Sequence, residues 1–122
     1  MALDLTTLLE LERQLAHATN GDPYREILAP HARVVVPGFV LDRENCAMAM
    51  DASPGWDRVD FENEQLVRIN SDAAALVYRF TGLRGDDRYI ADMVSCYVDT
   101  SEGPRLVTHQ HTMHWEGVEL EV

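Results

Sequence analysis

The spacing of apolar residues predicts two helices at the start of the chain. Leucines recur at helical intervals at positions 5, 8, 9, 11 and 15, and Thr7 with Glu10 has the spacing of a capping box. Asn20-Gly21 is a typical helix end. Asp22 followed by Pro23 is a typical helix start, so a second, short helix is expected before Pro30.

The hydrophobic period then changes from that of helices to that of strands. Residues 33–41 (RVVVPGFVL) predict a strand that Pro37-Gly38 bends or ends, and Asp42 is placed to cap a third helix over residues 43–51. After Trp56, the turn sequences NSD, RGDD and TSEG separate four long strand-like segments: RVDFENEQLVRI, AAALVYRFTGL, RYIADMVSCYVD and PRLVTHQHTMHW. Strands in this order form an antiparallel meander.

This order of elements predicts an α+β fold, in which three helices from the first half of the chain cover the concave face of a curved antiparallel sheet. Such a fold encloses a cone-shaped hollow between sheet and helices, where a small-molecule pocket would form. The chain has 122 residues, shows no linker or repeat, and is expected to be one domain over residues 1–122.

The amino-acid composition limits the classes of partner that the protein is expected to bind. The net charge is -11, from 21 acidic and 10 basic residues, and all ten basic residues are arginines. An acidic surface repels phosphate backbones and anionic lipids, so neither nucleic acid nor a membrane surface is an expected partner. The absence of lysine also excludes Schiff-base chemistry and P-loop phosphate binding.

The two cysteines, Cys46 and Cys96, do not have metal-ligand spacing. The sequence has no signal peptide and no apolar run long enough to span a membrane, so a cytoplasmic protein with free thiols is expected. A disulfide between the two remains an alternative.

Taken together, the motifs LLELERQLAHATNGDP, LAPHARVVVPGFVLDREN and YVDTSEGPRLVTHQHT resemble the nuclear transport factor 2-like superfamily, and most closely its SnoaL-like branch and related domains of unknown function. The resemblance covers nearly the whole chain. It implies a homodimer packed through the sheet, a pocket beside the helices, and either proton-transfer chemistry without metal or organic cofactor or a non-catalytic binding role. The catalytic sets of the superfamily's isomerases and epoxide hydrolases do not map onto this sequence residue by residue, so the resemblance fixes no reaction.

The stretch THQHTMHW contains the most distinctive candidate chemistry. Strand alternation puts Val107, His109, His111, Met113 and Trp115 on one face, with Leu106 and His114 on the other. If the first face lines the hollow, His109 and His111 are candidate general bases. They are alternatively hydrogen-bonded wall residues without a catalytic role. A metal site would need further ligands that the sequence does not offer.

Asp92, inside an otherwise apolar segment, is the candidate carboxylate that would orient His109 or His111 or share their proton. The alternative places Asp92 on the outer face of the sheet, paired with Arg79 or Arg88 on a neighbouring strand.

Four further residues are candidates for the pocket wall, each with a structural alternative. Trp56 would close the pocket mouth or anchor its own loop, Met48 would line the pocket or the core, and Cys96 is more simply a small core residue than a nucleophile. Met113 follows the histidines on their strand face.

The sequence thus predicts a pocket for a mainly apolar organic molecule with a carbonyl or hydroxyl group. The chemistry expected there is isomerase-, cyclase- or dehydratase-like proton transfer without a cofactor. The competing hypothesis is a non-catalytic ligand-binding or dimerisation domain.

Overall fold

The computed structural model describes residues 2–114. The elements follow the predicted order, with one strand more than predicted: α1 (Leu5–Ala16), α2 (Asp22–Ile27), β1 (Leu28–Val36), β2 (Phe39–Asp42), α3 (Arg43–Asp51), β3 (Arg58–Asn70), β4 (Ala73–Arg84), β5 (Asp87–Thr100) and β6 (Gly103–Met113). The segment predicted to be one bent strand is a hairpin, because Gly38 adopts φ 88° and turns β1 back into β2.

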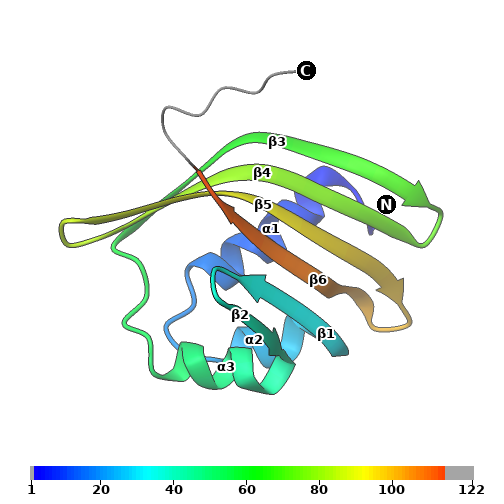
Figure 1. Cartoon of the computed structure of the whole chain (residues 1–122). Helices are drawn as coiled ribbons and strands as arrows, with labels where there is room; N and C mark the ends of the chain where they lie inside the picture. Colours follow the sequence, from blue (N-terminus) through cyan, green and yellow to red (C-terminus); the bar gives the residue numbers. More distant parts are fainter. Residues whose placement is uncertain (1, 115–122) are drawn as a thin grey trace.

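The strands form one curved, open sheet in the order β2-β1-β6-β5-β4-β3. The meander from β3 to β6 is antiparallel, as predicted, but β1 pairs with β6 in parallel, so the sheet is mixed. In Figure 1 the strands bend around the helices, with α1 beside the long strands and α2 and α3 below β1 and β2. The predicted α+β cone is confirmed.

One predicted helix start and one predicted helix end differ from the observed ones. The first helix begins one turn earlier than the Thr7-Glu10 capping box implied, because the Asp4 carboxylate accepts the Thr7 backbone N–H at 2.8 Å. Asp42 caps α3 as expected, accepting from the Asn45 backbone N–H at 2.8 Å. Gly21, predicted to end the first helix, instead lets α2 approach α3: a Cβ there would lie 2.2 Å from the Ala47 carbonyl oxygen.

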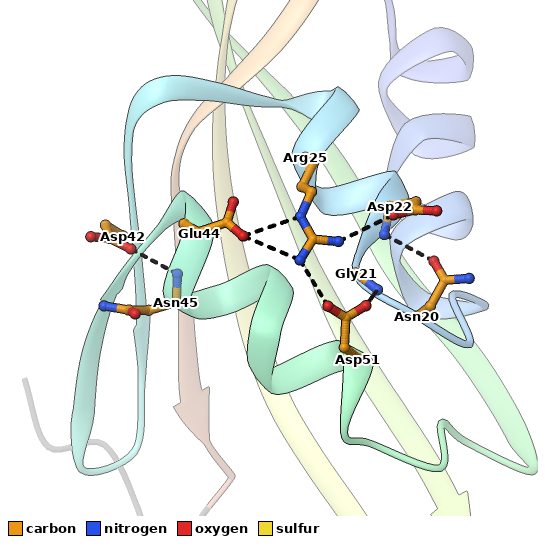
Figure 2. Close-up of polar contacts among 8 residues, drawn as sticks. All are labelled: Asn20, Gly21, Asp22, Arg25, Asp42, Glu44, Asn45 and Asp51. Carbon is orange, nitrogen blue, oxygen red and sulfur yellow. Dashed lines mark hydrogen bonds and ion pairs between the residues drawn. The ribbon is translucent and has the colours of Figure 1, made fainter.

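An ion-pair group at the surface joins α2 to α3 (Figure 2). The Arg25 guanidinium lies 2.7 Å from Asp51, 3.1 Å from Asp22 and 3.2 Å from Glu44. The same Asp51 carboxylate accepts the Gly21 backbone N–H at 2.7 Å. We call these four side chains the Arg25 cluster: Arg25, Asp22, Glu44 and Asp51.

A β-bulge in β6 decides which residues of that strand face the helices. Cys96 is opposite Thr108 but Tyr97 is opposite Leu106, so Val107 is an extra residue in β6. The prediction that Leu106 lies on the face opposite the histidines is therefore wrong. Leu106 is buried in the core at 1% exposure, on the same side as His109 and His111, and the alternation restarts after Val107.

Candidate functional site

A buried carboxylate lies at the centre of the concave face. Glu12, on the inner side of α1, is 2% exposed and accepts three hydrogen bonds from hydroxyl groups of the sheet. The donors are Tyr78 at 2.7 Å, Ser95 at 2.6 Å and Tyr97 at 2.5 Å. We call these four side chains the Glu12 network: Glu12, Tyr78, Ser95 and Tyr97.

Burial of a carboxylate is costly unless its oxygens are hydrogen-bonded. In this network the donors are neutral hydroxyl groups, and the ion pairs found among residues 2–114 bring no arginine to Glu12. Burial raises the pKa of both Tyr78 and Tyr97 well above the ordinary range, and the nearby Glu12 adds to the rise. The two phenols therefore stay protonated and act as donors.

The histidine pair adjoins this network. Ser95 is opposite His109 across β5 and β6, and Met93 is opposite His111, so both imidazoles point to the concave side. The Ser95 hydroxyl lies 2.6 Å from His109 Nδ1, and His109 Nε2 lies 2.8 Å from His111 Nε2. His111 Nδ1 in turn lies 3.1 Å from the Tyr89 hydroxyl. Five side chains thus form one continuous hydrogen-bonded chain.

Both histidines are held in the neutral form. Burial lowers the pKa of His109 below its ordinary value, although the charge of Glu12 opposes the shift. For His111, burial and the neighbouring His109 lower the pKa from 6.5 to about 3. Near neutral pH each imidazole therefore carries one proton and one bare nitrogen.

Two cavities meet at the histidine pair. The smaller, of about 50 Å³, reaches Glu12 and Trp56, while the larger, of about 220 Å³, is walled mainly by apolar residues of β1, β2 and α3. Three residues border both cavities: Tyr24, His109 and His111. The histidines therefore connect a polar recess to an apolar chamber.

Trp56 forms one wall of the smaller cavity. Its ring stacks on Tyr89 at 5.8 Å, and the Arg84 guanidinium lies 4.6 Å from the ring. This position depends on Gly82, because a Cβ there would come within 2.7 Å of the indole. The loop before β3 is held in turn by Arg84 Nε, which donates to the Gly55 carbonyl at 2.7 Å.

The carboxylate expected to accompany the histidines is a different residue. Asp92 lies on the outer face of the sheet, where it pairs with Arg79 at 3.0 Å, because β5 alternates and the inner positions are Met93 and Ser95. The alternative predicted for Asp92, an ion pair with an arginine on the outer face, is thus observed with Arg79. Glu12 takes the place beside the histidines.

Three of the four predicted pocket-wall residues lie elsewhere. Met48 is 58% exposed on α3, and its neighbour Met50 lines the larger cavity instead. Cys96 alternates with Ser95 and so lies on the outer face, while Met113, 46% exposed, lies at the end of β6 outside both cavities. Trp115 lies outside the described residues.

Cys46 lines the larger cavity, and burial raises the pKa of its thiol to about 11, so the thiol stays protonated at neutral pH. Both Cys46 and Cys96 are free thiols. Within residues 2–114, no group of three or more His, Cys, Asp or Glu side chains is arranged to hold a metal ion. None of the described helices is long and apolar enough to cross a bilayer.

Fold and site together define a cone-shaped α+β protein with a buried acid, a neutral histidine pair and adjoining cavities. No known protein-family profile matches the chain, and no curated protein is similar to it in sequence. Solved structures do match, and they establish that the chain has the nuclear transport factor 2-like fold, as the sequence resemblance implied.

Three of these structures illustrate the match. A candidate ketosteroid isomerase from Parabacteroides distasonis has 11% identity and a TM-score of 0.80 over 92% of this chain and 89% of its own. An NTF2-like protein of unknown function in nutrient uptake from Rhodospirillum rubrum has 15% identity and a TM-score of 0.79, covering 92% and 99%. A candidate Ca/calmodulin-dependent kinase II association domain from Exiguobacterium sibiricum has 20% identity and a TM-score of 0.71, covering 94% of each.

Proposed function

We propose that this protein binds a small, mainly apolar organic molecule and transfers a proton to or from it without a cofactor. The observation that carries the proposal is the connection between His111, which borders both cavities, and the buried Glu12. The apolar body of the ligand would occupy the larger cavity, and its carbonyl or hydroxyl group would contact the histidine pair.

The electrostatics of the site favour a neutral ligand. Both imidazoles are neutral, and Glu12 is hydrogen-bonded to three hydroxyl groups, with His109 Nδ1 3.6 Å from its Oε1, so the lining of the two cavities offers no cation to an anionic ligand. A weakly acidic O–H, or a C–H next to a carbonyl, is a suitable proton donor for such a site. The buried carboxylate is surrounded by neutral groups, so few other groups can give it a proton. Isomerase-, cyclase- and dehydratase-like reactions all begin or end with such a transfer.

Binding is tested with two probes that differ by one hydroxyl, 2-naphthol and naphthalene. We expect 2-naphthol to bind more tightly and to shift the imidazole NMR signals of His111. Val36→Phe, which fills the larger cavity, should abolish binding, whereas Val40→Phe, on an exposed position of β2, should not. Binding that is unaffected by Val36→Phe would place the ligand elsewhere.

Catalysis is tested by hydrogen exchange at the α-carbon of 1-tetralone in D2O, followed by NMR. The wild-type protein should accelerate exchange above the buffer rate, and His111→Gln should remove the acceleration. A specific observation favours a second candidate, non-catalytic binding: the Nε2 atoms of both histidines are occupied by each other at 2.8 Å. Binding of 2-naphthol together with exchange at the buffer rate would support that candidate over catalysis.

We also propose that the protein forms a homodimer through the outer face of the sheet. Two aliphatic residues on this face are partly exposed, Val67 at 50% and Val94 at 38%. Light scattering should give twice the mass of the chain, and Val94→Arg should shift it to the monomer mass. A monomer at high concentration in the wild type would contradict this proposal.

A further inference from the structure

The number of protons on each group fixes the direction of the hydrogen bonds around Glu12. Ser95 has a single hydroxyl proton, which it donates to Glu12 Oε1 at 2.6 Å. The Ser95 oxygen must therefore act as the acceptor in its contact with His109 Nδ1, also 2.6 Å away. It follows that His109 carries its proton on Nδ1.

The tautomer of His109 in turn determines the tautomer of His111. Because neutral His109 has only one ring proton, its Nε2 is bare and must accept from His111 Nε2 at 2.8 Å. His111 then has a bare Nδ1, which accepts from the Tyr89 hydroxyl at 3.1 Å. Every donor in the chain points inward, from the half-buried Tyr89 towards the buried Glu12.

We propose that Tyr89, His111, His109, Ser95 and Glu12 form a one-directional proton relay, with Glu12 as the proton acceptor of the site and Tyr89 as its outer terminus. This inference rests on the proposed function, and it assigns roles to two residues, Tyr89 and Ser95, that line neither of the two cavities meeting at the histidine pair. In it the histidines transmit the proton, and Glu12 is the base.

The transfer balances without any other reactant. A proton donor that reaches the half-buried Tyr89 gives a proton to the Tyr89 oxygen as Tyr89 gives its own to His111 Nδ1. His111 passes its Nε2 proton to His109 Nε2, His109 passes its Nδ1 proton to Ser95, and Ser95 passes its proton to Glu12. Each proton moves across one hydrogen bond, so the net result is one proton gained by Glu12 and one negative charge gained by the donor at Tyr89. Both imidazoles end in the opposite tautomer.

The relay is tested by the tautomers of the two histidines, read from the ¹⁵N signals of their ring nitrogens at neutral pH. We expect His109 to be protonated on Nδ1, the less common tautomer of free histidine, and His111 to be protonated on Nε2. Any other pair of tautomers would overturn the proposal, because the chain would then lack a single direction.

Substitution of Ser95 tests whether the links are coupled. Ser95→Val removes the hydroxyl and fills its space, so His109 should revert to the Nε2–H tautomer and His111 should change to Nδ1–H. Ser95→Thr, equal in shape to the valine variant but with a hydroxyl, should keep the wild-type pair. Thr108→Val, on the exposed side of β6, is the matched control and should also leave both tautomers unchanged. A His111 tautomer that stays the same in Ser95→Val would overturn the coupling.

Tyr89→Phe provides an independent test if the valine variant does not fold. If Glu12 sets the direction, removing the outer hydroxyl leaves both tautomers unchanged. A change of either tautomer would show that the direction is set from outside, contrary to the proposal. Because these readouts need no ligand, an intact relay together with no binding of 2-naphthol would contradict the proposed function alone.

Discussion

Two groups of carboxylates in this protein are stabilised in opposite ways. In the Arg25 cluster, three carboxylates at the surface surround one guanidinium (Figure 2). In the Glu12 network, one buried carboxylate is surrounded by three neutral hydroxyl groups. The first arrangement partly offsets the carboxylate charges where water already screens them, and the second satisfies a carboxyl group by hydrogen bonds alone where water is excluded. The cluster therefore joins two helices at the surface, whereas the network holds the proton acceptor that we propose for the site.

The largest expected effect is the loss of the Glu12 carboxylate. Glu12→Ala leaves three buried hydroxyl groups without their acceptor, and since each unpaired group costs about 1–3 kcal/mol, the free energy of unfolding should fall by roughly 3 kcal/mol or more. Urea denaturation measures the change. Glu10→Ala, on the exposed side of the same helix, is the control and should stay within about 0.5 kcal/mol of wild type. A similar loss in both variants would mean that the network contributes nothing specific.

The removal of one donor is expected to have the next largest effect. Tyr97→Phe deletes a hydrogen bond to a charged acceptor, which typically contributes about 1.5–3 kcal/mol. Tyr24→Phe is the matched control, because the Tyr24 hydroxyl donates to the Leu15 backbone carbonyl, a neutral acceptor, at 3.3 Å. Its cost should be about 0.5–1.5 kcal/mol. Equal costs would indicate that Glu12 is not the stronger acceptor.

The pH dependence of stability should reflect the neutral histidines. The pKa of His111 falls from 6.5 to about 3 on folding, so the unfolded chain binds the proton more readily between these values. This contribution to stability is complete above pH 6.5 and is lost as the pH falls towards 3, with a slope approaching about 1.4 kcal/mol per pH unit. The wild type should therefore lose stability more steeply than His111→Gln in urea denaturation across this window. The exposed His17→Gln should follow the wild type.

The smallest effect is expected in the Arg25 cluster. The Arg25 guanidinium, and secondarily the Gly21 backbone N–H, hold the pKa of Asp51 below its ordinary value. That contribution is present above the ordinary pKa and is lost as the pH falls through the lowered one. Asp51→Asn should therefore lower the melting temperature slightly at neutral pH, less so in high salt, and not at all near pH 2. A salt-independent loss would indicate packing rather than charge.

The elements of this fold were largely predictable because hydrophobic period and turn residues act locally. Four long strands, three helices and the Asp42 cap follow from residues near in sequence. The parallel pairing of β1 with β6 did not, because it joins segments far apart in the chain. The bulge at Val107 was also missed, because nothing in the local alternation marks an extra residue.

The candidate site was predictable only in part. Alternation put His109 and His111 on one face of their strand, and the apolar character of that face together with the family resemblance assigned it to the hollow. Their carboxylate was sought in β5, at Asp92, because an acidic residue is conspicuous in an apolar strand. Glu12 was missed, although it stands four residues after Leu8 and three before Leu15, on the buried stripe of α1. An acidic residue inside the apolar stripe of a helix was the available signal.

The extra residue in β6 changes the alternation of the side chains that follow it. Since a strand has only two settings for its side chains, the segment before Val107 and the segment after it keep separate phases, and one strand can close the core with Leu106 and still present His109 and His111 to the cavities. If Val107 were paired as a regular strand residue, the segment after it would move by one step, with both histidines turned outward and Gln110 and Thr112 brought in. Deletion of Val107 would instead leave Leu106, His109 and His111 in one continuous phase on the inner face.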